Sequence, residues 1–221
     1  MTELSIGELD SLILKAYRGA GFSWGMAQEA GRAAGWMALR GLPAADCFAE
    51  LLQRTDGLEH SVLTPAIDTA SHTGRSEAAS EGPVCCPVIA GTVLSDFGTT
   101  GSGESSTVCV YSPLILIPFV SACAESAGTA LSISTVTGES SIYLSADGQL
   151  VAGENDFATS ATTVLVSEST EAGTGFVAPT ARRAAVSEVV LKQLETLAHR
   201  TYVPASELSR SGAGAGLTDN D

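Results

Sequence analysis

Helical patterns at both ends of the chain and strand patterns in its middle restrict its fold more than any other feature. Apolar residues recur at helical spacing through residues 5–52 and again through residues 181–200. The segments rich in strand-favouring residues lie between them, at residues 84–97, 107–111, 131–136, 141–145, 150–152 and 162–167. Because helical and strand segments are segregated rather than alternating, the sequence predicts an α+β fold whose middle forms a mixed or antiparallel sheet.

The first helix is marked by its capping residues and its apolar face. Ser5 and Glu8 have the S-x-x-E spacing of a capping box, in which each side chain bonds the backbone N–H of the other residue. Apolar residues then follow the spacing of one buried helix face: Leu9, Leu12, Ile13, Ala16 and Tyr17. Gly19 and Gly21 are expected to end this helix.

A second helix, capped by Ser23 and extending to about residue 40, is lined with small residues. They are Ala27, Ala30, Gly31, Ala34, Gly35 and Ala38. A glycine inside a helix costs about 0.5–1 kcal/mol relative to alanine, so we expect the backbone of another element to approach this helix closely. Gly41 ends the helix, and Pro43 opens a third, short one.

Two further features are expected in the middle of the chain. The apolar run at residues 114–127 is interpreted as a buried helix, kinked by Pro118 and ended by Gly128. Asp147-Gly148 predicts a tight hairpin turn, because both residue types tolerate positive φ.

The late helix is expected over residues 181–200, where Pro204 blocks its continuation and a glycine-rich tail follows. We therefore expect one α+β domain over residues 1–221. The polar stretch at residues 71–82 has no apolar periodicity and reads as an exposed loop, which is where a sub-boundary would fall.

The charge balance excludes two classes of partner. Eleven Lys and Arg residues stand against twenty-five Asp and Glu residues, for a formal net charge of −14. Nucleic-acid and anionic-membrane surfaces require clustered basic residues, so we expect neither as a partner. The longest apolar run, residues 114–124, is about half of the ~20 residues that a membrane span requires.

The five cysteines favour a reduced, cytoplasmic protein. Their number is odd and no C-x-x-C spacing occurs. Glu3, Glu8 and Asp10 lie where a secretory signal would carry basic residues, so we expect free thiols and a cytoplasmic location. Cys86, next to Pro87 in an apolar run, is interpreted as a packed thiol.

Known catalytic signatures are missing. No nucleophile elbow, phosphate loop or zinc-protease motif occurs. Only three histidines are present, namely His60, His72 and His199. We interpret the first two as solvated loop residues and His199 as a complement to a helix dipole, so the sequence predicts no metal site and leaves the cofactor unknown.

Two segments concentrate arginines, aromatic rings and hydroxyls. On the second helix, Gln28, Arg32, Trp36 and Arg40 recur every four residues and Trp24 opens the helix. Arginines beside an indole can bind an anionic or planar ligand, and the alternative is a surface row of Arg packed over Trp. The C-terminal segment carries hydroxyls, one guanidinium and acids: Tyr202, Ser206, Ser209, Arg210 and Asp219.

Two functional hypotheses follow. In the first, the protein is a small-molecule binder or metabolic enzyme acting on a small anionic or amide-type metabolite, with its reaction class open. Trp24, Arg32 and Trp36 would meet the C-terminal segment, where Arg32 or Arg210 would hold the ligand. Ser206 and Ser209 would add hydroxyls, and Tyr202 or Asp219 would transfer a proton. In the second, it is a non-catalytic subunit or scaffold whose C-terminal tail docks onto a partner protein. A homo-oligomer is compatible with the first.

Several stretches follow a recognisable pattern. They include residues 5–9 (SIGEL), 18–25 (RGAGFSWG), 29–32 (EAGR) with Trp36, and 201–221, from TYVP to GAGAGLTDND; residues 86–87, 94–96 and 113–119 look similar more loosely. These stretches resemble a bacterial family known only as a domain of unknown function. The resemblance implies one full-length unit with an ordered tail, and it transfers no chemistry.

Overall fold

The computed structural model describes residues 1–65, 84–97, 105–135, 140–151, 162–169 and 180–202. Its α-helices are α1 (Ile6–Gly19), α2 (Trp24–Leu39), α3 (Ala44–Thr55), α4 (Pro87–Phe97), α5 (Ile117–Ala127) and α6 (Glu188–His199), with 3-10 helices η1 (His60–Leu63) and η2 (Pro113–Leu116). Its strands are β1 (Thr2–Ser5), β2 (Ser105–Val110), β3 (Leu131–Thr135), β4 (Ser141–Leu144), β5 (Leu150–Val151), β6 (Thr162–Glu168) and β7 (Arg183–Val186). The predicted α+β class is confirmed.

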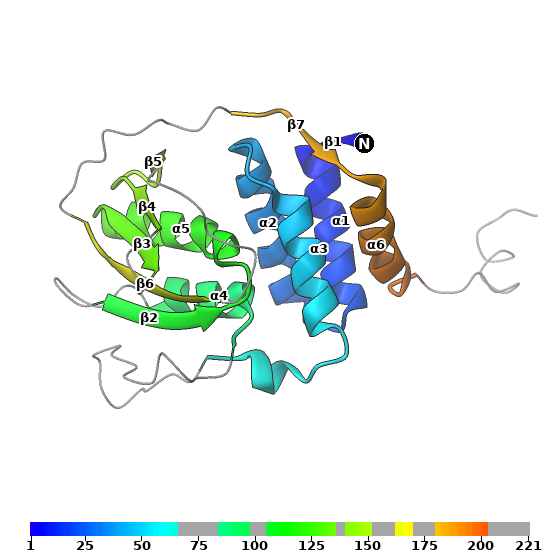
Figure 1. Cartoon of the computed structure of the whole chain (residues 1–221), viewed down its shortest axis with the longest axis horizontal. Helices are drawn as coiled ribbons and strands as arrows, with labels where there is room; N and C mark the ends of the chain where they lie inside the picture. Colours follow the sequence, from blue (N-terminus) through cyan, green and yellow to red (C-terminus); the bar gives the residue numbers. More distant parts are fainter. Residues whose placement is uncertain (66–83, 98–104, 136–139, 152–161, 170–179, 203–221) are drawn as a thin grey trace, which may run out of the picture.

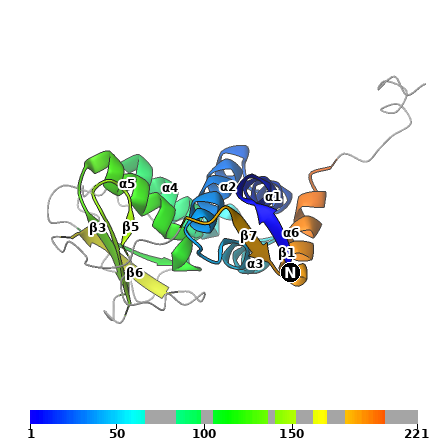
Figure 2. The ribbon, with the colours of Figure 1, turned by 90° about the horizontal axis from the view of Figure 1, so that it is seen from above.

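The described elements form two halves that lie side by side (Figure 1). The helical half contains α1, α2, α3, α6 and η1, with β1 and β7 paired as an antiparallel ribbon at one end. The sheet half contains the antiparallel sheet β2-β6-β3-β4-β5 with α4, α5 and η2. Figure 2, seen from above, places α4 and α5 together on one face of that sheet.

Local signals place the first three helices as predicted. Both bonds of the Ser5–Glu8 capping box form, and the Ser23 hydroxyl accepts the N–H of Met26. The small residues of α2 have the expected purpose, because a Cβ added to Gly31 would overlap the carboxylate of Asp10 on α1 and lie 3.0 Å from its backbone oxygen. Close contact between α1 and α2 therefore requires glycine at this position.

Two hydrophobic clusters share the interior. One fills the helical half around Tyr17, Phe22 and Phe48. The other lies between the sheet and α5, where inward-facing strand residues such as Ile133 and Val166 meet Val120. Trp36, Leu42 and Leu114 pack against both clusters, so they mark the seam between the two halves.

Residues 84–97, predicted as a strand, are mostly helical, and the prediction was wrong there. Cys85 makes a single parallel bridge to Val110, and α4 then begins at Pro87. Proline fits the first turn of a helix, where its missing N–H is not needed. A Cβ on Gly91 would overlap the ring of Phe119, so α4 packs tightly on α5. A short, uniformly apolar run does not reveal its own period.

The late helix begins later than predicted. Residues 183–186 form β7, which pairs with β1, and α6 starts at Glu188 after the Ser187 cap. The pairing joins residues about 180 positions apart, with Val186 opposite Thr2. Strand pairing of this range is absent from the local pattern, which is why the helical periodicity was extended too far.

Of the remaining predictions, two are confirmed and two concern residues that the structure does not describe. The buried helix over residues 114–127 is confirmed as η2 followed by α5; Pro118 lies in the first turn of α5 rather than at a kink within it, and Gly128 ends the helix at φ 62°. The hairpin at Asp147-Gly148 is confirmed, with φ 72° at Gly148. The loop at residues 71–82 and the tail at residues 211–221 lie outside the described residues. None of the described helices is both long and apolar enough to cross a membrane.

Candidate functional site

A surface groove of about 550 Å³ lies between α1 and α6. Its lining comes from the start and one face of α1 and from the last turns of α6: Ser5, Gly7, Glu8, Ser11, Leu12, Lys15, Glu195, Ala198, His199 and Tyr202. Ala198 is buried and Leu12 half-buried, whereas the charged side chains are exposed. The groove thus has an apolar floor and polar, charged walls.

Helical spacing explains why these side chains share one groove. On α1, residues 8, 11, 12 and 15 follow the i, i+3, i+4, i+7 pattern of one face, and residues 195, 198, 199 and 202 repeat it at the end of α6. Both helices begin beside the β1–β7 ribbon (Figure 1). At their far ends Gly19 meets Leu197, where an added Cβ would overlap the Leu197 carbonyl. The glycine therefore lets the two helices approach at that end.

Two nitrogen-bearing side chains surround the Tyr202 ring. Nζ of Lys15 lies 6.0 Å from the ring centroid, and the imidazole of His199 meets the ring edge-on with centroids 5.0 Å apart. The Tyr202 N–H donates to the His199 carbonyl at 3.1 Å, which places the phenol just beyond the end of α6. Among the described residues Lys15 forms no ion pair, so its ammonium is available to an anion.

Carboxylates occupy the other parts of the groove. Glu8 accepts the Ser5 backbone N–H at 2.7 Å, and this bond, with the Ser5 hydroxyl, lowers the pKa of Glu8 and keeps it ionised. Seven residues of helix separate Glu8 from Lys15, which is about 10 Å along the axis. Glu195 is exposed and precedes His199 by one turn. Opposite charges are therefore spaced along the groove at the length of a small metabolite.

Of the site residues predicted from sequence, Tyr202 lines this groove. Trp24, Arg32 and Trp36 do not, because α1 lies between α2 and α6 and contacts both (Figures 1 and 2). Ser206, Ser209, Arg210 and Asp219 lie outside the described residues. The described chain thus brings Tyr202 together with Lys15 and His199.

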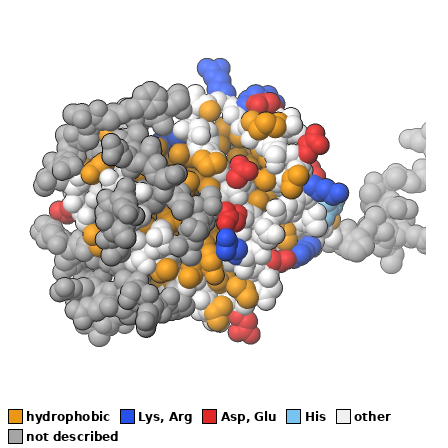
Figure 3. Space-filling model, viewed as in Figure 1, with side chains coloured by type: hydrophobic (Ala, Val, Ile, Leu, Met, Phe, Trp, Pro, Cys, Tyr) orange, Lys and Arg blue, Asp and Glu red, His pale blue; other side chains and the backbone are white. Residues whose placement is uncertain are grey.

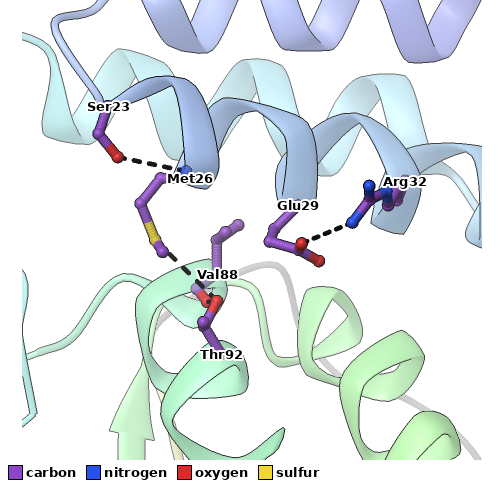
Figure 4. A network of polar contacts seen from close by, with 6 residues as sticks. All are labelled: Ser23, Met26, Glu29, Arg32, Val88 and Thr92. Atoms are coloured by element: carbon purple, nitrogen blue, oxygen red, sulfur yellow. Dashed lines mark hydrogen bonds and ion pairs between the residues drawn. The ribbon is translucent and has the colours of Figure 1, made fainter. Parts of the chain in front are cut away.

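The α2 residues have partners of their own. Arg32 is exposed and pairs with Glu29 at 2.8 Å, and Figure 4 shows it directed back along α2 toward that carboxylate. Trp24 is 62% exposed and lies under Arg18, whose guanidinium carbon is 4.8 Å from the ring centroid. Trp36 is half-buried beneath Arg40, at 3.7 Å. The predicted ridge of Arg and Trp exists, with Arg40 rather than Arg32 on the indole.

Figure 4 also shows how α2 is held against α4. The Thr92 hydroxyl donates to the Val88 carbonyl at 2.8 Å and lies 4.0 Å from the Met26 sulfur. These contacts are local and weak, and they leave Arg32 to one side. The contact between α2 and α4 therefore offers no second convergence of charged groups among the residues drawn.

The remaining histidines and thiols have structural surroundings. His60, expected to be solvated, is half-buried and stacks on Phe22 with centroids 4.1 Å apart. Cys86 is buried, as predicted, and its sulfur lies 3.7 Å from the Tyr17 hydroxyl. Desolvation raises the pKa of the Cys86 thiol, which is therefore protonated. Within the described ranges no three His, Cys, Asp or Glu side chains gather as a metal site.

Sequence reasoning missed Lys15, His199 and the role of α1 as a wall. The sequence does contain the helical spacing that places these residues on one face of each helix: residues 8, 11 and 15 on one, and residues 195, 199 and 202 on the other. Nothing in either pattern shows that α1 and α6 are neighbours, because they are separated by the whole sheet half.

A protein-family model matches part of the chain. Residues 4–79 match the family described as "Protein of unknown function (DUF3726)". The match covers α1, α2, α3 and η1 and confirms the resemblance seen in the N-terminal stretches. No curated protein and no solved structure matches the chain.

Proposed function

We propose that this protein binds a small metabolite in the α1–α6 groove, and that the metabolite carries an anionic group together with an amide or amine. The observation that carries the proposal is the convergence of Lys15, His199 and Tyr202, from two distant parts of the chain, on one groove.

The charges of the groove favour this class of ligand. Lys15 has no ion-pair partner among the described residues, so a carboxylate or phosphate would gain a charge-assisted hydrogen bond there. Glu8 and Glu195 would repel a purely anionic ligand, but they accept hydrogen bonds from an amide or an ammonium group. The length of the groove lets one molecule reach both ends.

Tyr202 is the residue we assign to proton transfer, should the bound molecule react. Among the described residues its phenol is the only aromatic hydroxyl lining the groove, and its ring lies near the Lys15 ammonium and the His199 imidazole. A phenol can donate or accept a proton, and a cation near its ring favours the charge that develops on the oxygen. The five described cysteines are free, and the same proposal places the protein in the reducing cytoplasm.

The test is a thermal-shift screen with carboxylates, amides, phosphates and amino-acid derivatives. A ligand at 100 times its Kd stabilises the native state by about 2.7 kcal/mol, which for a chain of this size is roughly 5–10 °C in Tm. We expect hits among molecules that combine an acid with an amide or amine, and a much smaller shift in Lys15→Met.

The chain offers a matched control, because Lys15 and Lys192 are its only lysines. Lys192 is exposed on α6 and does not line the groove, so Lys192→Met should keep the full ligand-induced shift. Equal loss of the shift in both variants, or retention in both, would contradict a ligand site at Lys15. Tyr202→Phe would then separate binding, which we expect to persist, from turnover.

A second candidate function, that of a non-catalytic subunit or scaffold, is favoured by apolar side chains outside the groove. Trp24, Leu58 and Val62 are 62%, 44% and 53% exposed. Exposed aromatic and aliphatic side chains are common anchors of protein interfaces, and the C-terminal tail would add to such an interface. Co-purification of a second protein at stoichiometric ratio, lost in Trp24→Ala, would support this candidate. A chain that elutes alone and binds a metabolite would contradict it.

A further inference from the structure

The carboxyl end of α2 carries a half-buried arginine, Arg40, whose surroundings differ from those of the described arginines that pair with a carboxylate. Arg32, Arg54 and Arg200 are each bonded to a carboxylate, at 2.7–2.8 Å. Arg40 is half-buried and has no acidic partner among the described residues. Buried or half-buried cations without a counter-charge are uncommon in proteins, because burial removes hydration that nothing replaces. No carboxylate within the described ranges therefore neutralises the charge of Arg40.

The guanidinium of Arg40 is held in a defined orientation. Its carbon lies 3.7 Å from the centroid of the Trp36 indole, and Nη1 donates to the Trp36 carbonyl at 3.2 Å. A guanidinium has five N–H donors, so this bond leaves most of the fork without a hydrogen-bond partner among the described residues. Stacking on the indole and one fixed bond pre-organise the remaining donors, which lowers the entropy that binding would cost.

The location is the seam between the helical and sheet halves. Trp36 packs against both hydrophobic clusters, so one face of the site is apolar. Burial lowers the pKa of Arg40, which reports the same loss of hydration. A low-dielectric wall strengthens any ionic interaction made in front of it.

The backbone that carries a second arginine, Arg182, crosses the end of α2. The Ala181 N–H donates to the Leu39 carbonyl at 2.7 Å, so the segment leading into β7 crosses the end of α2. Arg40 follows Leu39 and Arg182 follows Ala181. Arg182 is exposed and makes no ion pair within the described ranges. One backbone hydrogen bond thus joins the segments that carry Arg40 and Arg182, and neither arginine pairs with a carboxylate in the described part of the chain.

We propose that Arg40, stacked on Trp36 and assisted by Arg182, is an oxyanion-binding site at the seam, separate from the α1–α6 groove. The ligand group is a carboxylate or a phosphate, because both match the planar fork of a guanidinium and supply the missing negative charge. The site is independent of the proposed function, since neither arginine lines the groove.

Tryptophan fluorescence provides a direct reading of this site. The chain has two tryptophans, Trp24 and Trp36, so Trp24→Phe leaves Trp36 as the only indole. Titration of that variant with inorganic phosphate, and separately with succinate, at constant ionic strength should change the emission saturably. The two titrations distinguish a phosphate site from a carboxylate site. In the same background, Arg40→Gln should raise the half-saturating concentration at least tenfold, and Arg182→Gln should raise it less.

The structure contains a close control in Arg18, which also lies over a tryptophan and also donates to a backbone carbonyl, that of Phe22. Arg18→Gln should leave the titration unchanged, as should Lys15→Met in the groove. Circular dichroism establishes that each variant is folded, and Arg40→Lys keeps the charge while removing the fork, so it should bind more weakly than the parent. No saturable change with either anion, or an unchanged half-saturating concentration in Arg40→Gln, overturns the proposal.

Discussion

The helical half and the sheet half solve the problem of close packing in different ways. In the helical half, glycines let backbones approach closely. Gly19 on α1 lies against the Leu197 backbone of α6, and Gly31 on α2 lies against Asp10 of α1. In the sheet half, side chains fill the space, as Phe119 does against Gly91 between α4 and α5. Backbone atoms cannot rotate out of the way, whereas a side chain can, so the helical half is expected to tolerate substitution less.

The two halves also differ in the polar and charged side chains on their surfaces. The outward face of the sheet carries hydroxyls and few charges: Ser132, Ser134, Ser141, Tyr143 and Ser167. The helical half carries the groove and both arginine–tryptophan stacks. On the face drawn in Figure 3, its acidic and basic side chains are spread over the surface, several of them beside a side chain of opposite charge. The convergence of charge in the groove is therefore a local feature rather than part of a broad charged patch on that face.

The largest expected effect tests the packing contrast directly. Gly19→Ala should destabilise the protein by about 3 kcal/mol, because the new methyl group would overlap the Leu197 carbonyl and force α1 and α6 apart. Gly91→Ala should cost less, about 1–2 kcal/mol, because the overlapping atoms belong to the Phe119 side chain, whose ring a change of χ1 and a small shift of α5 can move away. Urea unfolding of both variants measures the difference. A larger loss in Gly91→Ala would reverse the comparison of the two halves.

The next effect concerns buried thiols. Burial raises the pKa of the Cys47 thiol, in the helical half, to about 11. An unfolded thiol ionises near pH 8.5, so between these values the unfolded state holds fewer protons and stability falls as pH rises. The loss attributable to Cys47 should reach roughly 2–3 kcal/mol by pH 11. It should be absent from Cys47→Ala, measured by urea unfolding at pH 8 and pH 10.5.

Cys123 is the matched thiol of the sheet half. Burial also raises its pKa, but it is 6% exposed where Cys47 is 0% exposed, so we expect Cys123→Ala to remove a smaller part of the alkaline loss. If Cys123→Ala removed more of the alkaline stability loss than Cys47→Ala, the sheet half would be the interior that excludes water better.

The smallest effect compares hydroxyls in the two halves. Ser23 caps α2 by accepting the Met26 N–H at 3.3 Å, and Ser23→Ala should cost about 1 kcal/mol. Ser132 in the sheet pairs with the Ser167 hydroxyl at 3.2 Å, and Ser132→Ala should cost about 0.5 kcal/mol, since cross-strand pairs contribute less. Thermal unfolding of both variants shows which substitution causes the larger loss of stability. An equal or larger loss in Ser132→Ala would show that the sheet depends on its hydroxyl pairs more than α2 depends on its cap.

Sequence reasoning performed best where the signal is local. Ser5 and Glu8, Ser23, Gly128 and Asp147-Gly148 were each placed correctly, because capping and turn formation involve residues within a few positions of one another. It failed at residues 84–97, where an apolar run without a clear period became α4, and at residues 183–186, where pairing with β1 replaced the helix.

The candidate site follows the same division. The sequence by itself determined the buried face of α1, the α+β class and the need of α2 for a close neighbour, because each depends on periodicity or residue size along a short stretch. Only the tertiary structure decided that α1 lies between α2 and α6, that Tyr202 meets Lys15, and that Trp36 lies at the seam between the two halves. The physical reason is that these contacts join segments whose side chains recognise one another through shape and burial, which a one-dimensional pattern does not record.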